Sequence, residues 1–83
     1  MTTPDWLVKH GGELRPGPIG GALYVYFDGQ PQYSLTPTPV AGKHSCSVIQ
    51  TINGRRLDSG GTHGAIEEAM QGGLEDLRKA LGW

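Results

Sequence analysis

The chain has 83 residues, of which 36% are hydrophobic, and its formal net charge is −1 with histidine neutral. A chain of this length forms one small domain with a limited core, and its aliphatic and aromatic content argues against global disorder. The near-neutral charge disfavours strong, sequence-independent binding to duplex nucleic acid, which needs a clear excess of Lys and Arg.

The cysteine content and the hydropathy of the sequence indicate the cellular compartment in which the protein is expected. The single cysteine, Cys46, excludes a disulfide within the chain and is typical of a reducing environment. No apolar run is long enough to span a membrane, and residues 1–6 lack the basic and apolar regions of a secretory signal. We therefore expect a cytoplasmic protein that does not contact a membrane.

The first 21 residues predict a short N-terminal element followed by an irregular loop. Residues 4–10 fit one or two turns of helix with Asp5 near the start, where a carboxylate suits the helix dipole, and a short strand is the alternative. Residues 15–21 contain two prolines and three glycines, which predict a loop without regular structure. The glycine spacing matches neither a dinucleotide-binding motif nor a P-loop, so no phosphate site is expected there.

Residues 22–27 give the clearest strand of the sequence. The segment is rich in residues that favour β-structure, and its side chains alternate along the chain. This alternation places Leu23, Val25 and Phe27 on one face of the strand and Tyr24 and Tyr26 on the other.

A second strand is expected over residues 32–36, after a turn at Asp28-Gly29. Tyr33 and Leu35 share one of its faces. The prolines that follow are expected to end the strand, because proline cannot donate a hydrogen bond to a sheet. Residues 37–43 then form a second loop.

Residues 45–52 and 55–58 predict a hairpin around Asn53-Gly54, the strongest two-residue turn signal. In this register Ile52 pairs with Arg55, and Gln50 pairs with Leu57. The more apolar face, which should meet the core, then carries Cys46, Val48, Gln50, Ile52, Arg55 and Leu57. The outer face carries Ser45, Ser47, Ile49, Thr51, Arg56 and Asp58.

The last element is a helix expected over residues 62–82, with Thr62 as N-cap. An apolar stripe at helical spacing predicts the face that meets the sheet: Ile66, Met70, Gly73, Leu74, Leu77 and Leu81. Gly73 lies within this stripe, which favours a close approach of helix and sheet, with a kink in the helix as the alternative. We predict a single α+β domain over residues 1–83, with an antiparallel sheet of three or four strands and a C-terminal helix packed on one face.

Catalytic and metal sites are not expected. His44, Cys46 and His63 offer three candidate ligands where structural zinc usually has four, and Cys46 is expected to point into the core. A reactive cysteine needs a partly exposed, electropositive setting, which a core position does not supply. Glu67 and Glu68 diverge around the helix and do not form an acid–base pair. We therefore predict no enzyme, no metal and no cofactor.

The outer face of the sheet is the candidate binding surface, carried by Tyr24, Tyr26, Ile49 and Arg56. Tyr and Arg are enriched as anchors in protein interfaces, and exposed aromatics beside arginine also stack single-stranded bases. A third interpretation places the tyrosines beneath the N-terminal segment with Trp6, as ordinary packing. We predict a noncatalytic interaction module that binds a protein partner or a second copy through this face or a free sheet edge, with single-stranded RNA as the alternative.

One segment and the order of the elements resemble known families. Residues 60–69, Gly-Gly-Thr-His-Gly-Ala-Ile-Glu-Glu-Ala, resemble the helix start of HicB-type antitoxin domains, with two extra residues before Ile66; this resemblance implies an antitoxin-like regulatory protein. The order of the elements also resembles double-stranded-RNA-binding domains. Those domains have a Lys-rich start to the last helix, where this chain has Glu67 and Glu68, so the same kind of binding is not expected.

Overall fold

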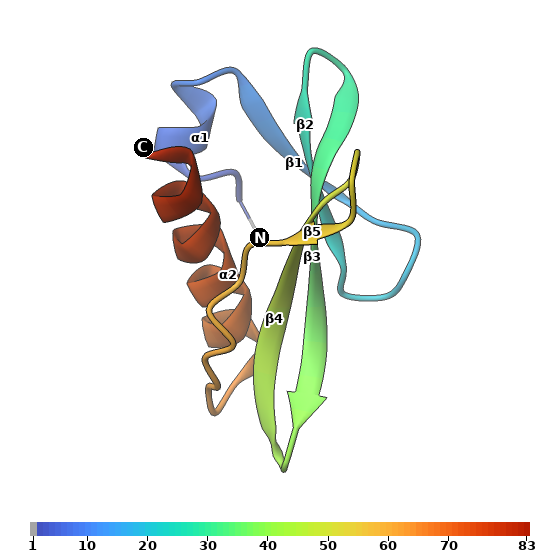
Figure 1. Cartoon of the computed structure of the whole chain (residues 1–83), viewed down its shortest axis with the longest axis vertical. Coiled ribbons are helices and arrows are strands. Elements are labelled where there is room, and N and C mark those ends of the chain that lie inside the picture. The colour runs from blue at the N-terminus through green and yellow to red at the C-terminus, as the bar shows by residue number, and fades with distance from the viewer. Residues whose placement is uncertain (1) are drawn as a thin grey trace.

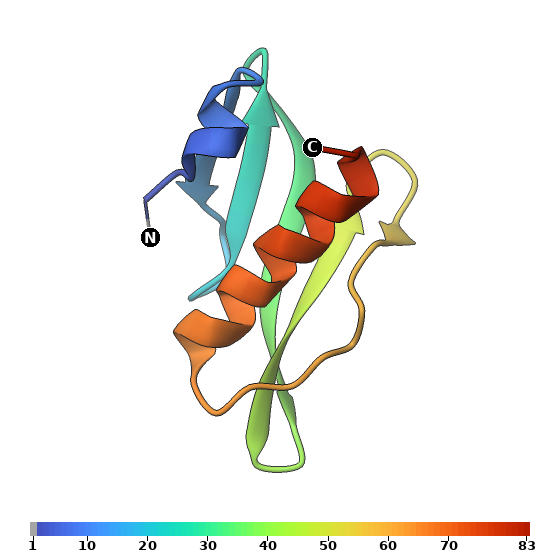
Figure 2. The same ribbon diagram turned by 90° about the vertical axis from the view of Figure 1, so that its left-hand side faces the viewer.

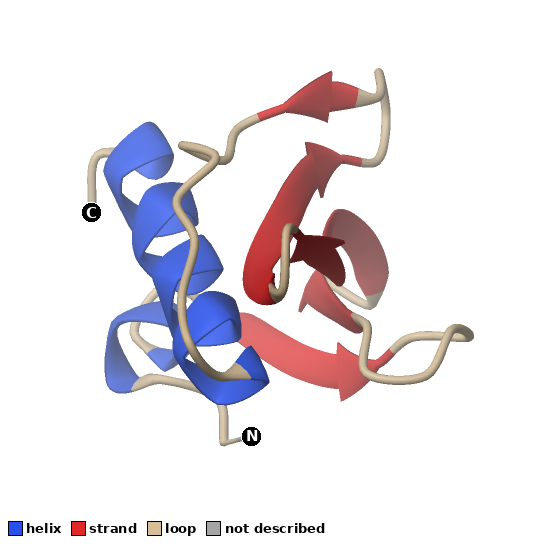
Figure 3. Ribbon diagram, turned by 90° about the horizontal axis from the view of Figure 1, so that it is seen from below, coloured by secondary structure: helices blue, strands red, loops and turns tan. Residues whose placement is uncertain are grey.

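The computed structural model describes residues 2–83 and shows a molecule of two layers (Figure 1). Within these residues, five antiparallel strands form one open sheet in the order β1-β2-β3-β4-β5, so each strand pairs with the next one along the sequence. Two helices lie on one face of the sheet, and no helix of residues 2–83 covers the other face (Figure 3). This arrangement confirms the predicted α+β fold, with five strands instead of three or four.

The elements follow one another as α1 (Asp5–Val8), β1 (Gly12–Pro16), β2 (Leu23–Phe27), β3 (Gln30–Val40), β4 (Lys43–Gln50), β5 (Arg55–Arg56) and α2 (Ile66–Leu81). The short N-terminal helix is therefore confirmed as α1. The turn at Asp28-Gly29 is confirmed too, and both residues have the positive φ that a tight hairpin turn requires, at 53° and 75°.

Strand β1 corrects the prediction that residues 15–21 form a loop without regular structure from their first residue. Arg15 pairs with Tyr24 across the first hairpin, so the irregular loop begins only after Pro16. Proline fits at this place because β1 is an edge strand and its nitrogen can face away from β2. Gly12 is needed where β1 passes Leu7, because an added Cβ would lie 2.6 Å from the Cγ atom of that leucine.

Strand β3 corrects the prediction that prolines end it near residue 36 and that residues 37–43 form a loop. The strand continues through Pro37 and Pro39, both of which pair with β4. The pairing of β3 with β2 stops at Leu35. Beyond that point no described strand lies beside the β2 side of β3, so the missing N–H groups of the prolines break no hydrogen bond there. A tight turn at Ala41-Gly42, with φ of 48° and 79°, then leads into β4.

The hairpin between β4 and β5 has a different register from the predicted one. Gln50 pairs with Arg55, so the loop holds the four residues 51–54 instead of two. Inside this loop the side-chain oxygen of Asn53 accepts the backbone N–H of Arg55 at 3.0 Å, and this contact favours the longer turn. Ile52, predicted on the core face, lies instead on the turn with 82% of its surface exposed.

The core lies between α2 and the middle of the sheet, since α2 contacts β3 and β4. The predicted close approach at Gly73 is confirmed: an added Cβ would lie 2.9 Å from the Cβ of Cys46 and 3.3 Å from a methyl group of Val48. The largest fully buried side chains are Leu7, Leu35, Leu77, Val25 and Val48.

Helix α2 begins at Ile66, later than predicted, and Thr62 does not cap it. The N-cap position is Ala65, which makes no side-chain cap hydrogen bond. Residues 57–65 cross the open side of β4 before the helix starts (Figure 2). There His63 and His44 exchange two backbone hydrogen bonds, of 2.7 and 2.9 Å. The segment predicted as the first helical turn therefore pairs with the start of β4 instead.

Candidate functional site

A single row of side chains crosses the outer face of the sheet. The pairing registers align Arg15 of β1, Tyr24 of β2, Ser34 of β3, Ile49 of β4 and Arg56 of β5. Paired residues of antiparallel strands point to the same face, and the neighbours of this row in the three central strands, Val25, Leu35 and Val48, are buried in the core on the helix side. The row therefore unites three of the four predicted binding residues and has an arginine at each end.

Tyr26, the fourth predicted residue, lies beside the β1 end of this row. Its ring centroid is 6.4 Å from that of Tyr24, and the guanidinium carbon of Arg15 lies 4.4 Å from the Tyr26 centroid, within cation–π range. The same guanidinium donates to the carboxylate of Glu13 at 3.2 Å, which lowers the pKa of Glu13. Arg15 is thus held between a ring and a carboxylate, and we call Glu13, Arg15, Tyr24 and Tyr26 the Arg15–tyrosine cluster.

The opposite end of the row is anchored by Asp58. Arg56 donates to the two carboxylate oxygens of Asp58 at 3.2 and 2.8 Å. The Asp58 side chain is only 3% exposed, and it also accepts the backbone N–H of Val48 at 3.0 Å. The hydrogen bond from Arg56, and then that from Val48, lower the pKa of Asp58 below its ordinary range. Arg56 therefore has a structural partner as well as an exposed position on the face.

Hydroxyl groups occupy the middle of the outer face. The Thr38 and Ser47 side-chain oxygens lie 3.1 Å apart, and Ser34 belongs to the central row. Because each arginine of the face is paired with a carboxylate, the surface is close to neutral and is lined with groups that can donate and accept hydrogen bonds.

The sheet edges are less suited to binding than the sequence predicts. On β1 the N–H of Leu14 already donates to the side chain of Thr3, and Pro16 has no N–H. The unpaired side of β3 contains Pro37 and Pro39, which offer acceptors and no donors. The outer side of β4 is occupied by β5 and by residues 57–63. Strand addition is thus disfavoured along all three edges.

The packing interpretation for the tyrosines is not supported. Trp6 packs against the core on the helix side, where its ring centroid lies 6.3 Å from that of Trp83. Tyr24 and Tyr26 follow the opposite alternation along β2 from the buried Val25. The two tyrosines are half-buried by their own neighbours on the outer face and leave their remaining surface to solvent.

Cys46 lies in the core, as predicted. Burial, and then the carboxylates of Asp58 and Asp76, raise the pKa of its thiol to about 11. A protonated, enclosed thiol is a poor nucleophile. Within residues 2–83 no three His, Cys, Asp or Glu side chains are grouped closely enough to hold a metal ion.

Sequence reasoning missed Glu13 and Arg15 as part of the surface. It assigned Arg15 to a glycine- and proline-rich loop, although Glu13-Leu14-Arg15 alternates polar and apolar side chains as an edge strand does. That alternation was the available signal, and the proline after it concealed the strand.

No protein-family model, curated protein or solved structure matches this chain. The resemblance of residues 60–69 to HicB-type antitoxins and that of the element order to double-stranded-RNA-binding domains therefore stay predictions. Neither helix described for residues 2–83 has the length and apolar character needed to cross a membrane.

Proposed function

We propose that this chain is a noncatalytic interaction module that binds a partner protein through the outer face of its sheet. The observation that carries the proposal is the Arg15–tyrosine cluster, which is held in place on a face that no described element covers. Tyr and Arg dominate the energetics of many protein interfaces. Side chains that are already fixed lose less conformational entropy when a partner arrives, so such a cluster is a suitable anchor.

The charge pattern favours a protein over single-stranded RNA. Phosphate groups would have to approach Arg15 beside Glu13 and Arg56 beside Asp58, and both carboxylates repel them. Counterion release gives RNA binders much of their affinity, and a face with paired charges offers little of it. A protein surface can instead match both signs at once, together with the central hydroxyl groups.

Quantitative affinity capture with variants tests the proposal. Wild-type protein, Arg15→Glu, Tyr24→Ser and the control Lys43→Glu are immobilised at equal density and exposed to extract from the source cells. Lys43 lies at the start of β4, away from the central row, and makes no ion pair within residues 2–83. We expect one partner to be retained by wild type and control and lost by both face variants, and then to bind purified wild type with the same ranking.

A titration with fluorescent single-stranded oligouridine decides the alternative. Tight binding that weakens steeply with salt and is lost in Arg15→Glu would replace the protein partner with RNA. Equal capture by wild type and both face variants would remove the outer face from consideration.

A further inference from the structure

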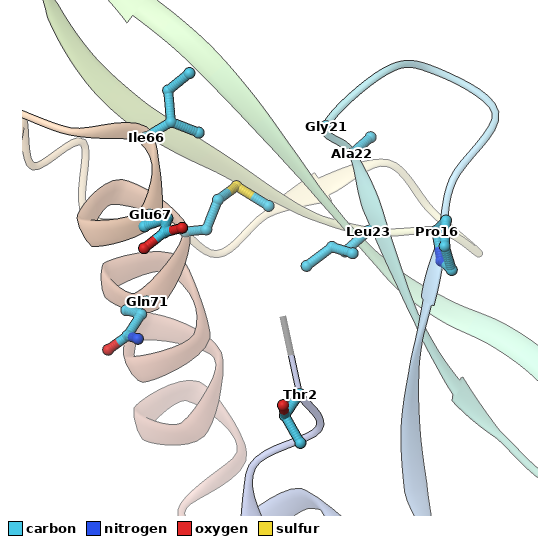
Figure 4. Close-up of a pocket in the computed structure, with 9 residues that line it drawn as sticks. Thr2, Pro16, Gly21, Ala22, Leu23, Ile66, Glu67 and Gln71 are labelled. Carbon is cyan, nitrogen blue, oxygen red and sulfur yellow. The ribbon is translucent and has the colours of Figure 1, made fainter.

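The helix side of the sheet has a hollow that neither helix fills. Helix α2 contacts β3 and β4, and α1 contacts β1, so the start of β2 has no helix above it. A hollow of about 560 Å³ opens there, between the first turns of α2 and the β1–β2 end of the sheet (Figure 4). Leu23, Ala22 and Pro16 form its sheet side, and Ile66, Met70 and Glu67 form its helix side.

This hollow combines apolar walls with one carboxylate, that of Glu67. Met70 is buried at the hollow, while Ile66 at its mouth keeps 49% of its surface exposed. Glu67 is exposed on the same wall and forms no ion pair within residues 2–83 (Figure 4). The chemistry fits an aliphatic side chain that is accompanied by a cation.

The chain itself presents such a group on the turn between β4 and β5. Ile52 is the most exposed large hydrophobic side chain of residues 2–83, at 82%. Arg55 follows it directly after the turn, is exposed, and forms no ion pair within the described residues. An exposed aliphatic side chain with a cation three residues away therefore complements the hollow in apolar character and in charge.

The turn is also held in a fixed conformation. Thr51 donates its backbone N–H to Gln32 at 2.9 Å and its hydroxyl to the carbonyl of Pro31 at 2.7 Å. Gly54 donates to the carbonyl of Gln50 at 2.8 Å. A rigid turn that projects isoleucine into water is ready to bind, because little entropy remains to be lost on docking.

We infer that the Ile52 turn of one copy docks in the hollow of a second copy, with Arg55 beside Glu67. The turn joins β4 to β5 at one edge of the sheet, whereas the sheet side of the hollow belongs to β1 and β2 at the other edge, and Figure 2 shows these two pairs of strands on opposite sides of the sheet. The contact therefore joins two different surfaces in a head-to-tail manner, and a bound pair still offers one free turn and one free hollow. An interface built on one inserted side chain is small, so the association is weak and reversible. It leaves the outer sheet face free for the partner proposed above.

Sedimentation and light scattering across protein concentration, up to ~1 mM, test this association. We expect the weight-average mass to rise with concentration and the rise to weaken by about tenfold or more in Ile52→Ser, Arg55→Glu and Glu67→Arg. Glu67→Gln serves as a milder variant, since it removes the charge without placing a cation at the start of α2. Ile19→Ser is the control, because Ile19 is 65% exposed in a different loop.

Charge exchange gives the decisive result. Arg55→Glu and Glu67→Arg should each fail to associate alone and should associate when mixed, because each supplies what the other lacks. Amide shifts that change with concentration should lie in residues 51–55 and around the hollow. A mass that stays monomeric at every concentration overturns the inference, as does an association that survives Ile52→Ser. Loss of self-association in Tyr24→Ser would move the contact to the outer face, whereas capture of a partner by the Ile52 variant leaves the proposed function intact.

Discussion

Asp58 holds the edge of the sheet through its side chain, because its carboxylate accepts the backbone N–H of Val48 at 3.0 Å. Strand β5 ends at Arg56, so beyond that point β4 has lost its neighbouring strand. The carbonyl of Val48 is still paired, with the N–H of Leu57 at 2.8 Å. The carboxylate of Asp58 thus supplies the acceptor that a longer strand would have provided, and Arg56 neutralises it from the outer face.

Replacement of this carboxylate should destabilise the domain. Asp58→Ala leaves the N–H of the buried Val48 without an acceptor, and a buried unsatisfied donor costs about 1–3 kcal/mol in the free energy of unfolding. Asp58→Asn keeps an acceptor oxygen and should lose less. Urea denaturation measures both, with the exposed Glu68→Ala as control. Equal stability of Asp58→Ala and the control would show that the carboxylate is not needed at this edge.

The lowered pKa of Asp58 also predicts a specific response to acid. The ordinary value for this carboxyl is 3.8, and the folded value lies below it. The stabilising contribution is therefore fully present above the unfolded value and is lost as the pH falls through the folded value. Urea midpoints between pH ~6 and ~2 should fall more steeply in wild type than in Asp58→Asn. Parallel curves for the two proteins would contradict this prediction, and Glu13→Gln measures the separate contribution of the exposed ion pair at β1.

The features predicted correctly from the sequence are those that depend on local alternation. Val25 and Tyr24 were assigned to opposite faces because strand side chains alternate whatever the neighbouring strands do. Glycine within an apolar stripe favours a close helix–sheet contact, with a kink in the helix as the alternative, and the contacts of Gly73 with Cys46 and Val48 support the close approach. The outer-face residues followed from the same alternation, so most of the candidate surface could be derived before the structure.

The predictions that were wrong concern strand ends, turns and caps whose conformation depends on residues distant in the sequence. The sequence predicts that Pro37 ends a strand, because proline cannot donate a hydrogen bond to a sheet. Proline is nevertheless tolerated where one side of the strand has no partner, and the sequence does not show which strands are neighbours. Asn53-Gly54 indicated a two-residue turn, but the Asn53 side chain and the anchoring of Thr51 to the β2–β3 hairpin select a four-residue loop. Thr62 has the chemistry of an N-cap, yet its neighbour His63 is bound to β4.

Helix–sheet contact at Gly73 should tolerate no side chain. Gly73→Ala gains helix propensity of about 1 kcal/mol. Its Cβ would nevertheless meet Cys46 and Val48 inside a packed core, where overpacking costs about 1–3 kcal/mol. We expect a net loss of stability, measured by thermal and urea unfolding.

Gly72→Ala is the matched comparison for this position. Its added Cβ would lie 2.8 Å from the imidazole Nε2 of His63, the far end of a side chain that can move aside. The loss of stability should therefore be smaller for Gly72→Ala than for Gly73→Ala. In the double variant, Cys46→Ala removes the sulfur and should restore part of the stability lost in Gly73→Ala. A Gly73→Ala protein as stable as Gly72→Ala would show that the two layers separate easily.

Reactivity of the single thiol should report opening of the same contact. The Cys46 pKa of about 11 and the burial of this side chain predict that alkylation by iodoacetamide at pH 8 is far slower in the folded protein than in urea. The folded rate should rise in Gly73→Ala, since a strained helix–sheet contact opens more often, and should stay unchanged in Tyr24→Ser, whose side chain lies on the opposite face. Mass spectrometry of timed samples measures the rates. Fast alkylation of the folded wild type would mean that α2 leaves the sheet readily, and the stability expected from the Gly73 contact would have to come from elsewhere in the core.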